Sequence, residues 1–193
     1  MLNNLEKYRI ILGSNSPRRK ELLAGLGLNF EVKPMPDLDE SYPESLEAEE
    51  IPVFIANKKA DAYRPALAKD DLLITADTIV WINNQVLGKP VDREDAIQML
   101  RTLSAHTHEV ITGVCLATTE KSVSFSVVST VRFAPIKEED IAYYIDTYRP
   151  YDKAGAYGIQ EWIGYVAVEG IEGSFYNVMG LPIQRVYQEL SRF

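Results

Sequence analysis

The sequence predicts a mixed α/β fold: a twisted sheet flanked by helices, bilobed with a central cleft. Three observations predict it. Short apolar runs alternate with helical patterns, one long pair of runs alternates apolar and polar residues, and no Gly/Ser-rich or Pro-rich linker divides the chain. We expect a single domain over residues 1–193, because this length is ordinary for one domain.

The first elements follow from local chemistry. Residues 8–13 are apolar and predict a short buried strand. Ser16 and Pro17 occupy the preferred N-cap and first positions of a helix, and Gly27 is a plausible stop. Residues 29–33 predict the next strand.

The rest of the chain continues the alternation. We expect, in order, an acidic Pro-rich loop (34–50), a helix (51–67), a strand (72–82) interrupted at Ala76-Asp77-Thr78, a short strand at Val86-Leu87, a helix capped by Asp92, a hairpin (108–117 and 122–133), a helix (137–148), a Gly/Tyr-rich stretch, two short strands and a C-terminal helix.

Composition excludes several classes of function. Lys and Arg number 20 against 28 Asp and Glu, so the net charge of −8 disfavours binding to nucleic acid or anionic membrane through bulk electrostatics. A single cysteine, Cys115, permits neither an intrachain disulfide nor a Cys-based zinc site, and His106 and His108 are too few for a His-rich metal centre. Without a signal-peptide core or an apolar run of membrane length, we expect a cytoplasmic protein.

The segment after the first strand is unusual for a helix start. Arg18 and Arg19 open the helix, although cations are unfavourable near its positive N-terminus. A bound anion would reverse this, since Ser14, Ser16, an arginine fork and backbone N–H groups could converge on phosphate oxygens. The alternative is a solvated basic turn; a Walker A loop is excluded, because its spaced glycines are absent.

Acidic residues supply a second candidate site. Asp77 lies in an apolar strand, where a carboxylate is costly unless it is paired or binds a metal, although it could also cap a strand end. Asp37, Asp39 and Glu40 lie in the acidic loop and by themselves are ordinary solvated residues. Paired with Asp77, such a loop could hold Mg²⁺, which is bound through one or two carboxylates plus substrate phosphates.

Two lysines and one Gly/Tyr-rich stretch are weaker candidates for the site. Lys59 lies in an alanine-lined helix and Lys89 in a Gly-Lys-Pro turn, and either could be an ordinary surface lysine. The stretch 151–160 combines glycines with tyrosines, which suits a loop beside a planar ligand, and Gln160 would offer it a donor and an acceptor. A tight inter-strand loop is the alternative.

Taken together, these segments resemble the Maf family of nucleoside triphosphate pyrophosphatases. The matching blocks span nearly the whole chain: Ser14–Leu23 (S-x-S-P-R-R-x-x-L-L), Asp39-Glu40, Ala56–Ala60 (A-x-x-K-A), Ala76-Asp77-Thr78, Gly88-Lys89-Pro90, His108-Glu109-Val110, Thr112-Gly113-Val114, Asp152–Gln160, Gly173-Ser174, Asn177-Val178 and Gly180-Leu181-Pro182. Each block is weak alone, but their order is specific.

The resemblance implies an inosine triphosphate pyrophosphatase-like fold and hydrolysis between the α- and β-phosphates. Asp77 would accept the proton of the attacking water with Glu40 as supporting acid, and both would hold Mg²⁺ or Mn²⁺. The implied phosphate-binding residues are Ser14, Ser16, Arg18, Arg19, Lys59 and Lys89, and the implied base-specificity residues are Arg18, Thr78 and Gln160. By analogy, a homodimer is expected.

Within the family, the K-A-G-A-Y-G-I-Q form at 153–160 resembles the branch that acts on dTTP and UTP. Glu161 departs from the glycine expected there and adds a charge beside the base pocket. Two alternatives stay open: an inosine/xanthosine triphosphate pyrophosphatase, and a non-enzymatic nucleotide sensor that regulates cell division. A nucleic-acid-binding module is disfavoured by the charge.

Overall fold

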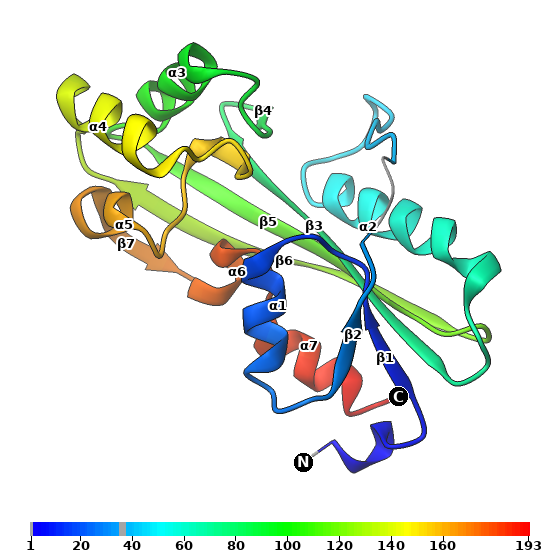
Figure 1. Cartoon of the computed structure of the whole chain (residues 1–193). Helices are drawn as coiled ribbons and strands as arrows, with labels where there is room; N and C mark the ends of the chain where they lie inside the picture. Colours follow the sequence, from blue (N-terminus) through cyan, green and yellow to red (C-terminus); the bar gives the residue numbers. More distant parts are fainter. Residues whose placement is uncertain (1, 35–37) are drawn as a thin grey trace. The chain divides into compact units, whose positions relative to one another are not determined.

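The computed structural model describes residues 2–34 and 38–193, and its elements alternate as expected of an α/β protein (Figure 1). In this part of the chain the strands are β1 (Arg9–Leu12), β2 (Phe30–Val32), β3 (Asp71–Ile82), β4 (Gln85–Leu87), β5 (Thr107–Ala117), β6 (Ser122–Phe133) and β7 (Val168–Glu172). The α-helices are α1 (Pro17–Ala24), α2 (Glu50–Tyr63), α3 (Arg93–Leu103), α4 (Glu138–Tyr148), α5 (Trp162–Ala167), α6 (Phe175–Met179) and α7 (Ile183–Leu190).

The strands form one mixed sheet in the order β2-β1-β3-β5-β6-β7, and β4 pairs with β3 outside this path. β1 runs parallel to β2 and to β3, with Ile11 opposite Glu31 on one side and Leu73 on the other. β3 and β4 are antiparallel, as are β6 and β7. The mixed sheet flanked by helices confirms the predicted fold class.

The chain divides into two compact units built from interleaved segments. Unit 1 contains residues 1–77, 112–127 and 180–193, and unit 2 contains residues 78–111 and 128–179. The boundary falls within β3, between Asp77 and Thr78. The single domain and the central cleft stay predictions of the sequence.

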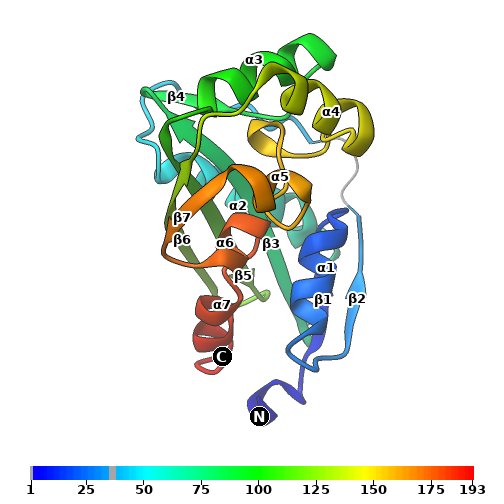
Figure 2. The same ribbon diagram turned by 90° about the vertical axis from the view of Figure 1, so that its left-hand side faces the viewer.

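In unit 1, α1 begins as its sequence predicts. The Ser16 hydroxyl accepts a hydrogen bond from the Arg19 backbone N–H at 3.4 Å, and Pro17 occupies the first helical turn. The helix ends at Ala24, earlier than the predicted stop at Gly27. The two chain ends lie in the same part of this unit (Figure 2), and the Asn4 amide donates to the Leu190 carbonyl at 2.9 Å.

Small residues bring α2 close to the sheet in unit 1. Ala56 and Ala60 are fully buried, and the Thr75 hydroxyl of β3 donates to the Ala56 carbonyl at 2.8 Å. A Cβ added at Gly113 of β5 would lie only 2.2 Å from the Pro52 carbonyl carbon, so any side chain there would push the helix away. This contact fixes the height of α2 above the strands.

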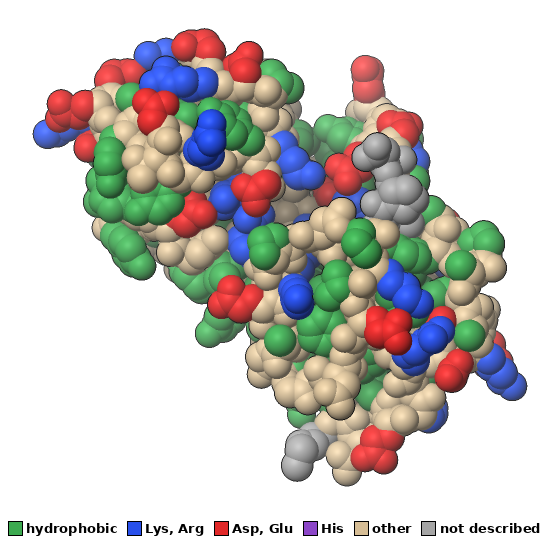
Figure 3. Space-filling view, in the orientation of Figure 1, with side chains coloured by type: hydrophobic (Ala, Val, Ile, Leu, Met, Phe, Trp, Pro, Cys, Tyr) green, Lys and Arg blue, Asp and Glu red, His purple; other side chains and the backbone are tan. Residues whose placement is uncertain are grey.

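In unit 2, α3 and α4 lie side by side in both views (Figures 1 and 2). Asp92 caps α3 by accepting from the Asp95 N–H at 2.9 Å, as predicted. Ion pairs join the helices: Arg93 with Asp146 and Arg101 with Glu138, each at 2.7 Å. Acidic and basic side chains are accordingly interspersed over these helices in Figure 3.

Two details of the prediction are wrong. β3 runs without a break from Asp71 to Ile82, so Asp77 lies inside a continuous strand. After residue 160 the structure has one strand, β7, and the short helices α5 and α6, where we expected two short strands. No helix in residues 2–34 or 38–193 combines the length and apolar character needed to cross a bilayer.

Candidate functional site

Two carboxylates and one lysine meet in unit 1. The Lys59 ammonium lies 2.7 Å from Asp77 Oδ1 and 2.8 Å from Glu40 Oε1. The side chains of Lys59 and Asp77 are only 11% and 13% exposed, whereas Glu40 is 45% exposed. The structure thus brings together three residues that the sequence analysis had assigned to the site from three separate segments.

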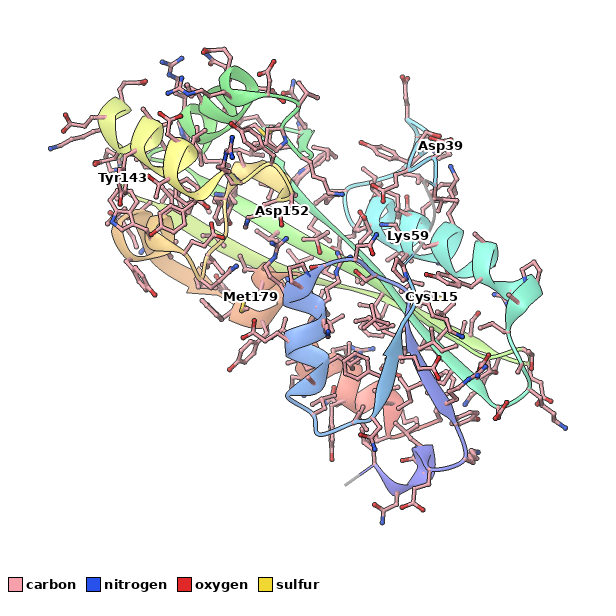
Figure 4. All side chains as sticks on the ribbon, in the orientation of Figure 1. Asp39, Lys59, Cys115, Tyr143, Asp152 and Met179 are labelled. Atoms are coloured by element: carbon pink, nitrogen blue, oxygen red, sulfur yellow. The ribbon has the colours of Figure 1, made fainter. Side chains whose placement is uncertain are left out.

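The fold positions each member of this group. Ala60 of α2 faces the sheet beside Lys59, so the lysine leaves the helix next to β3, and Figure 4 shows it extending from α2. Asp77 is carried by β3, and Glu40 by the segment that precedes α2. Lys59 is shared between the two acids, and the charges of Asp77 and Glu40 also act on Arg19 of α1.

Arg19 anchors the strand next to Asp77. Its Nε donates to the Gly180 carbonyl at 2.8 Å, and Nη1 donates to the Ala76 carbonyl at 2.8 Å. Removal from water lowers the pKa of the guanidinium, and the charges of Asp77 and Glu40 oppose this shift. Arg19 therefore ties α1, β3 and the segment before α7 together, and its phosphate-binding role stays a prediction.

The serines of the same loop make hydrogen bonds within it. Ser14 is buried, and its hydroxyl accepts from the Ser16 N–H at 3.1 Å, while Nη1 of Arg19 lies 3.5 Å away. The predicted phosphate-binding residues Ser14, Ser16 and Arg19 are thus in mutual contact in unit 1. Arg18, half-buried in the first turn of α1, is carried by the same segment.

The described acids of the loop before α2 differ in whether they contact Lys59. Asp39 accepts from the Ser41 N–H at 2.9 Å and pairs with Lys58 at 3.2 Å; hydrogen bonds from Ser41, then from Lys58, lower its pKa to about 2. Figure 4 places Asp39 in the loop before α2. Asp37 lies outside the described residues. Of the acids that the structure describes in this loop, Glu40 is the one that reaches Lys59.

The remaining predicted site residues belong to unit 2. Thr78 follows Asp77 in β3 and is half-buried, and Lys89 is exposed in the turn after β4. Gln160 is half-buried, and its amide oxygen is buried without a hydrogen-bond partner among the described residues. A role for these three beside Lys59 stays a prediction.

The donor chemistry at Lys59 suits a hard cation. Glu40 and Asp77 each direct a carboxylate oxygen at one cationic nitrogen, and oxygen ligands of this kind suit Mg²⁺ or Mn²⁺ held partly by substrate phosphates. Within residues 2–34 and 38–193, no group of three or more His, Cys, Asp or Glu is arranged to hold a metal ion. That Glu40 and Asp77 hold a metal ion stays a prediction.

His108 and Cys115 are both buried in β5, away from Lys59 and its partners in the sequence. His108 is buried in β5 between the rings of Phe133 and Tyr157, and burial lowers its pKa to about 4. Cys115 is buried in the same strand, and burial raises the pKa of its thiol. His108 therefore lies within the predicted hairpin and packs among aromatic rings, and Cys115 is a buried residue of the same strand.

Comparison with known proteins agrees with this geometry. The family model described as Maf-like protein matches residues 9–193, a span that includes every residue named above except those of the N-terminal turn. The chain belongs to the Maf family. It is 62% identical to the dTTP/UTP pyrophosphatase of Parabacteroides distasonis and 60% identical to that of Bacteroides fragilis, and each alignment covers both proteins completely.

Solved structures show the fold of this Maf protein. A HAM1 protein from Coxiella burnetii is 16% identical and superposes with a TM-score of 0.53, covering 96% of this chain and 100% of the other. At this identity the likeness concerns the fold alone.

Sequence reasoning missed several contacts that shape the site. It did not foresee that Arg19 would bind backbone carbonyls, because this requires knowing which segments meet. It also missed the ion pair of Arg9 with the fully buried Asp71, although a charged residue beginning an apolar strand was a signal for it. In unit 2 it missed the contacts of Lys153 with Asp152 and Glu161.

Proposed function

We propose that this Maf protein hydrolyses dTTP and UTP to the monophosphate and pyrophosphate. The observation that carries the proposal is identity of 57–62% over the full chain to several proteins named dTTP/UTP pyrophosphatase. The convergence of Glu40, Lys59 and Asp77 supports it, because these acids and this lysine suit attack of water on a phosphoryl group.

Asp77 is the proposed proton acceptor. Its carboxylate is partly shielded from solvent and held by Lys59, so it can take a proton from water as the oxygen attacks the α-phosphorus. The bond from that phosphorus to the bridging oxygen breaks, and the oxygen leaves with pyrophosphate. Lys59, Arg18 and Lys89 offset the negative charge of the triphosphate.

Mg²⁺ or Mn²⁺ is part of the proposal, with Glu40 and Asp77 as its protein ligands. Bound there, the ion would supply charge neutralisation at the phosphates. Lys59, which contacts both carboxylates, would offset charge on the substrate phosphates beside them. A cytoplasmic location and a homodimer belong to the same set of predictions.

Base selection is the less direct part of the proposal. A glutamine amide matches the O4 acceptor and N3–H donor of uracil and thymine, and the buried amide oxygen of Gln160 lacks a hydrogen-bond donor among the described residues. An inosine/xanthosine triphosphate pyrophosphatase and a non-enzymatic sensor are not favoured by the named relatives.

The test is product analysis across nucleotides. Phosphorus NMR of the reaction with dTTP, UTP, ITP and GTP, with Mg²⁺ and after chelation, should show pyrophosphate from dTTP and UTP in the presence of Mg²⁺. Orthophosphate in its place would mean that a different bond is cleaved. Faster turnover of ITP than of dTTP and UTP would favour an inosine/xanthosine triphosphate pyrophosphatase. Nucleotide binding without turnover would favour a sensor.

A further inference from the structure

A second lysine in this protein is held between two carboxylates, in unit 2. The Lys153 ammonium lies 2.7 Å from Asp152 Oδ1 and 3.1 Å from Glu161 Oε1, and its side chain is only 9% exposed. Asp152, labelled in Figure 4, is 53% exposed, whereas Glu161 is 19% exposed. Glu161 is therefore the more buried of the two carboxylates that share this buried lysine.

Both carboxylate oxygens of Glu161 are engaged. Oε1 faces Lys153, and Oε2 accepts a hydrogen bond from the Tyr144 hydroxyl of α4. The same hydroxyl accepts from the Gly158 N–H at 2.9 Å. Burial raises the pKa of Tyr144, as do its hydrogen bond to Glu161 and the negative charge there, so the phenol keeps its proton and remains the donor.

The loop is packed closely around this ion pair. A Cβ added at Gly158 would lie 2.9 Å from Glu161 Cδ and 2.9 Å from Lys153 Cε, so residue 158 has no room for a side chain. Gly155, at φ +68°, would bring a Cβ to 2.9 Å from Val80. Glu161, Lys153 and Tyr144 thus close a loop whose conformation is fixed by contacts at several points.

Gln160 lies directly before Glu161 in this loop. Its amide oxygen is buried and has no hydrogen-bond partner among the described residues. A buried acceptor without a donor is costly and persists only where its surroundings hold it in place. The ion pair and the phenol hydrogen bond at Glu161 supply that restraint one residue away.

We infer that Glu161 is a positioning residue for nucleobase selection: it fixes the 152–161 loop through Lys153 and Tyr144 and so holds the Gln160 amide ready for a pyrimidine base. The inference rests on the proposed function. Glu161 does not touch the base in this account. Its carboxylate faces Lys153, which it shares with Asp152, and the Tyr144 hydroxyl.

The experiment compares Glu161→Ala and Glu161→Gln with the control Glu169→Ala, which removes an exposed glutamate from its surface ion pair with Arg132 in the same unit. The ratio of kcat/KM for dTTP to that for GTP should fall about tenfold in Glu161→Ala, chiefly through KM for dTTP, because a loosened amide loses a specific hydrogen bond. Glu161→Gln, which keeps an acceptor for Tyr144, should restore part of the ratio. The control should keep it.

A second readout does not depend on turnover. Hydrogen exchange of the Gly158 amide should accelerate in Glu161→Ala and stay unchanged in Glu169→Ala, because the Tyr144 hydroxyl loses its anchor. Faster exchange with an unchanged nucleotide ratio would overturn the inference, as would an equal loss of kcat/KM for every nucleotide. If Glu161→Ala does not fold, Glu161→Gln decides by the same two readouts. Absence of pyrophosphate release from dTTP and UTP by the unmodified protein would refute the proposed function itself.

Discussion

Two lysines of this protein share one arrangement and differ in where their partners come from. Lys59 in unit 1 lies between Glu40 and Asp77, and its partners belong to a loop and to a central strand. Lys153 in unit 2 lies between its own neighbour Asp152 and Glu161, within one loop. Both lysines are nearly buried, so burial does not distinguish them.

The difference teaches what each cluster can do. A cluster made of distant segments depends on the whole unit, and in unit 1 it brings two carboxylates and a lysine together, the side chains that the proposed metal and triphosphate require. A cluster made within one loop stabilises that loop, and at Glu161 both oxygens are already used by Lys153 and Tyr144. We therefore assign the chemistry to the first cluster and the shape of the loop to the second.

Asp77→Asn should have the largest effect if the cluster around Lys59 performs the chemistry. Removing the proton acceptor should lower kcat for dTTP by about 10³-fold or more, in line with the usual contribution of a general base. Pyrophosphate release measures it. The exposed residue Asp70 supplies a matched control: Asp70→Asn removes an acid that lies seven residues before Asp77 and just before β3, and it should keep full activity.

His108 is buried like the two lysines, but the cause of its shifted pKa is burial and not a charged partner. Burial alone lowers the pKa of His108 to about 4, whereas the unfolded chain has a value near 6.5. Above pH 6.5 the imidazole is neutral in both states; as the pH falls from 6.5 to 4 the unfolded state binds the proton first, and about 3 kcal/mol of stability is lost. Urea unfolding of His108→Gln should be less sensitive to pH over this range. If the free energy of unfolding of His108→Gln varied with pH just as that of the unmodified protein does, the lowered pKa of His108 would be contradicted.

Adjacent lysines on α2 allow a matched pair of variants. Lys59→Gln should lower kcat/KM for dTTP by about 30-fold, since a charge-assisted contact contributes about 2 kcal/mol. Lys58→Gln removes the exposed contacts with Asp39 and Ser41 and should change kcat/KM for dTTP less than twofold, a small effect expected of a surface ion pair. Equal losses in both variants would remove the special role of Lys59.

The smallest expected effect concerns an ion pair that is purely structural. Asp71 is fully buried, receives two hydrogen bonds from Arg9 and one from the Ala68 N–H, and its pKa is lowered by them. Asp71→Asn should cost about 1–2 kcal/mol of stability, because Arg9 is partly exposed and can be hydrated. The wild-type contribution is present at neutral pH and is lost as the pH falls through the acid range. Thermal unfolding should show the loss while kcat of the folded enzyme stays unchanged.

Local chemistry explains what the sequence could predict. Ser16 and Asp92 cap their helices because their side chains reach backbone N–H groups three residues away, which needs no tertiary contact. Asp77 stood out because a carboxylate in an apolar strand needs a partner. Residues 162–167 and 175–179 were mispredicted because helices of five or six residues are too short to display a helical period.

Long-range contacts explain the rest. Lys59 could not be matched to Glu40 and Asp77 from spacing, because α2 reaches β3 through the small residues Ala56 and Gly113. The Arg19 anchor on Ala76 and Gly180 likewise joins segments far apart in the chain. Glu161 looked like a disturbance beside the base pocket until Lys153 and Tyr144 were found to engage it.

The central claim is that Lys59 acts on the triphosphate and Glu161 on base selection. The most direct test measures the ratio of kcat/KM for dTTP to kcat/KM for GTP in Lys59→Gln and in Glu161→Ala. Every nucleotide carries the same triphosphate, so the Lys59 variant should slow both substrates equally and leave the ratio as in the unmodified protein. The Glu161 variant should change the ratio itself. A ratio that moves with Lys59 and stays constant with Glu161 would contradict the account.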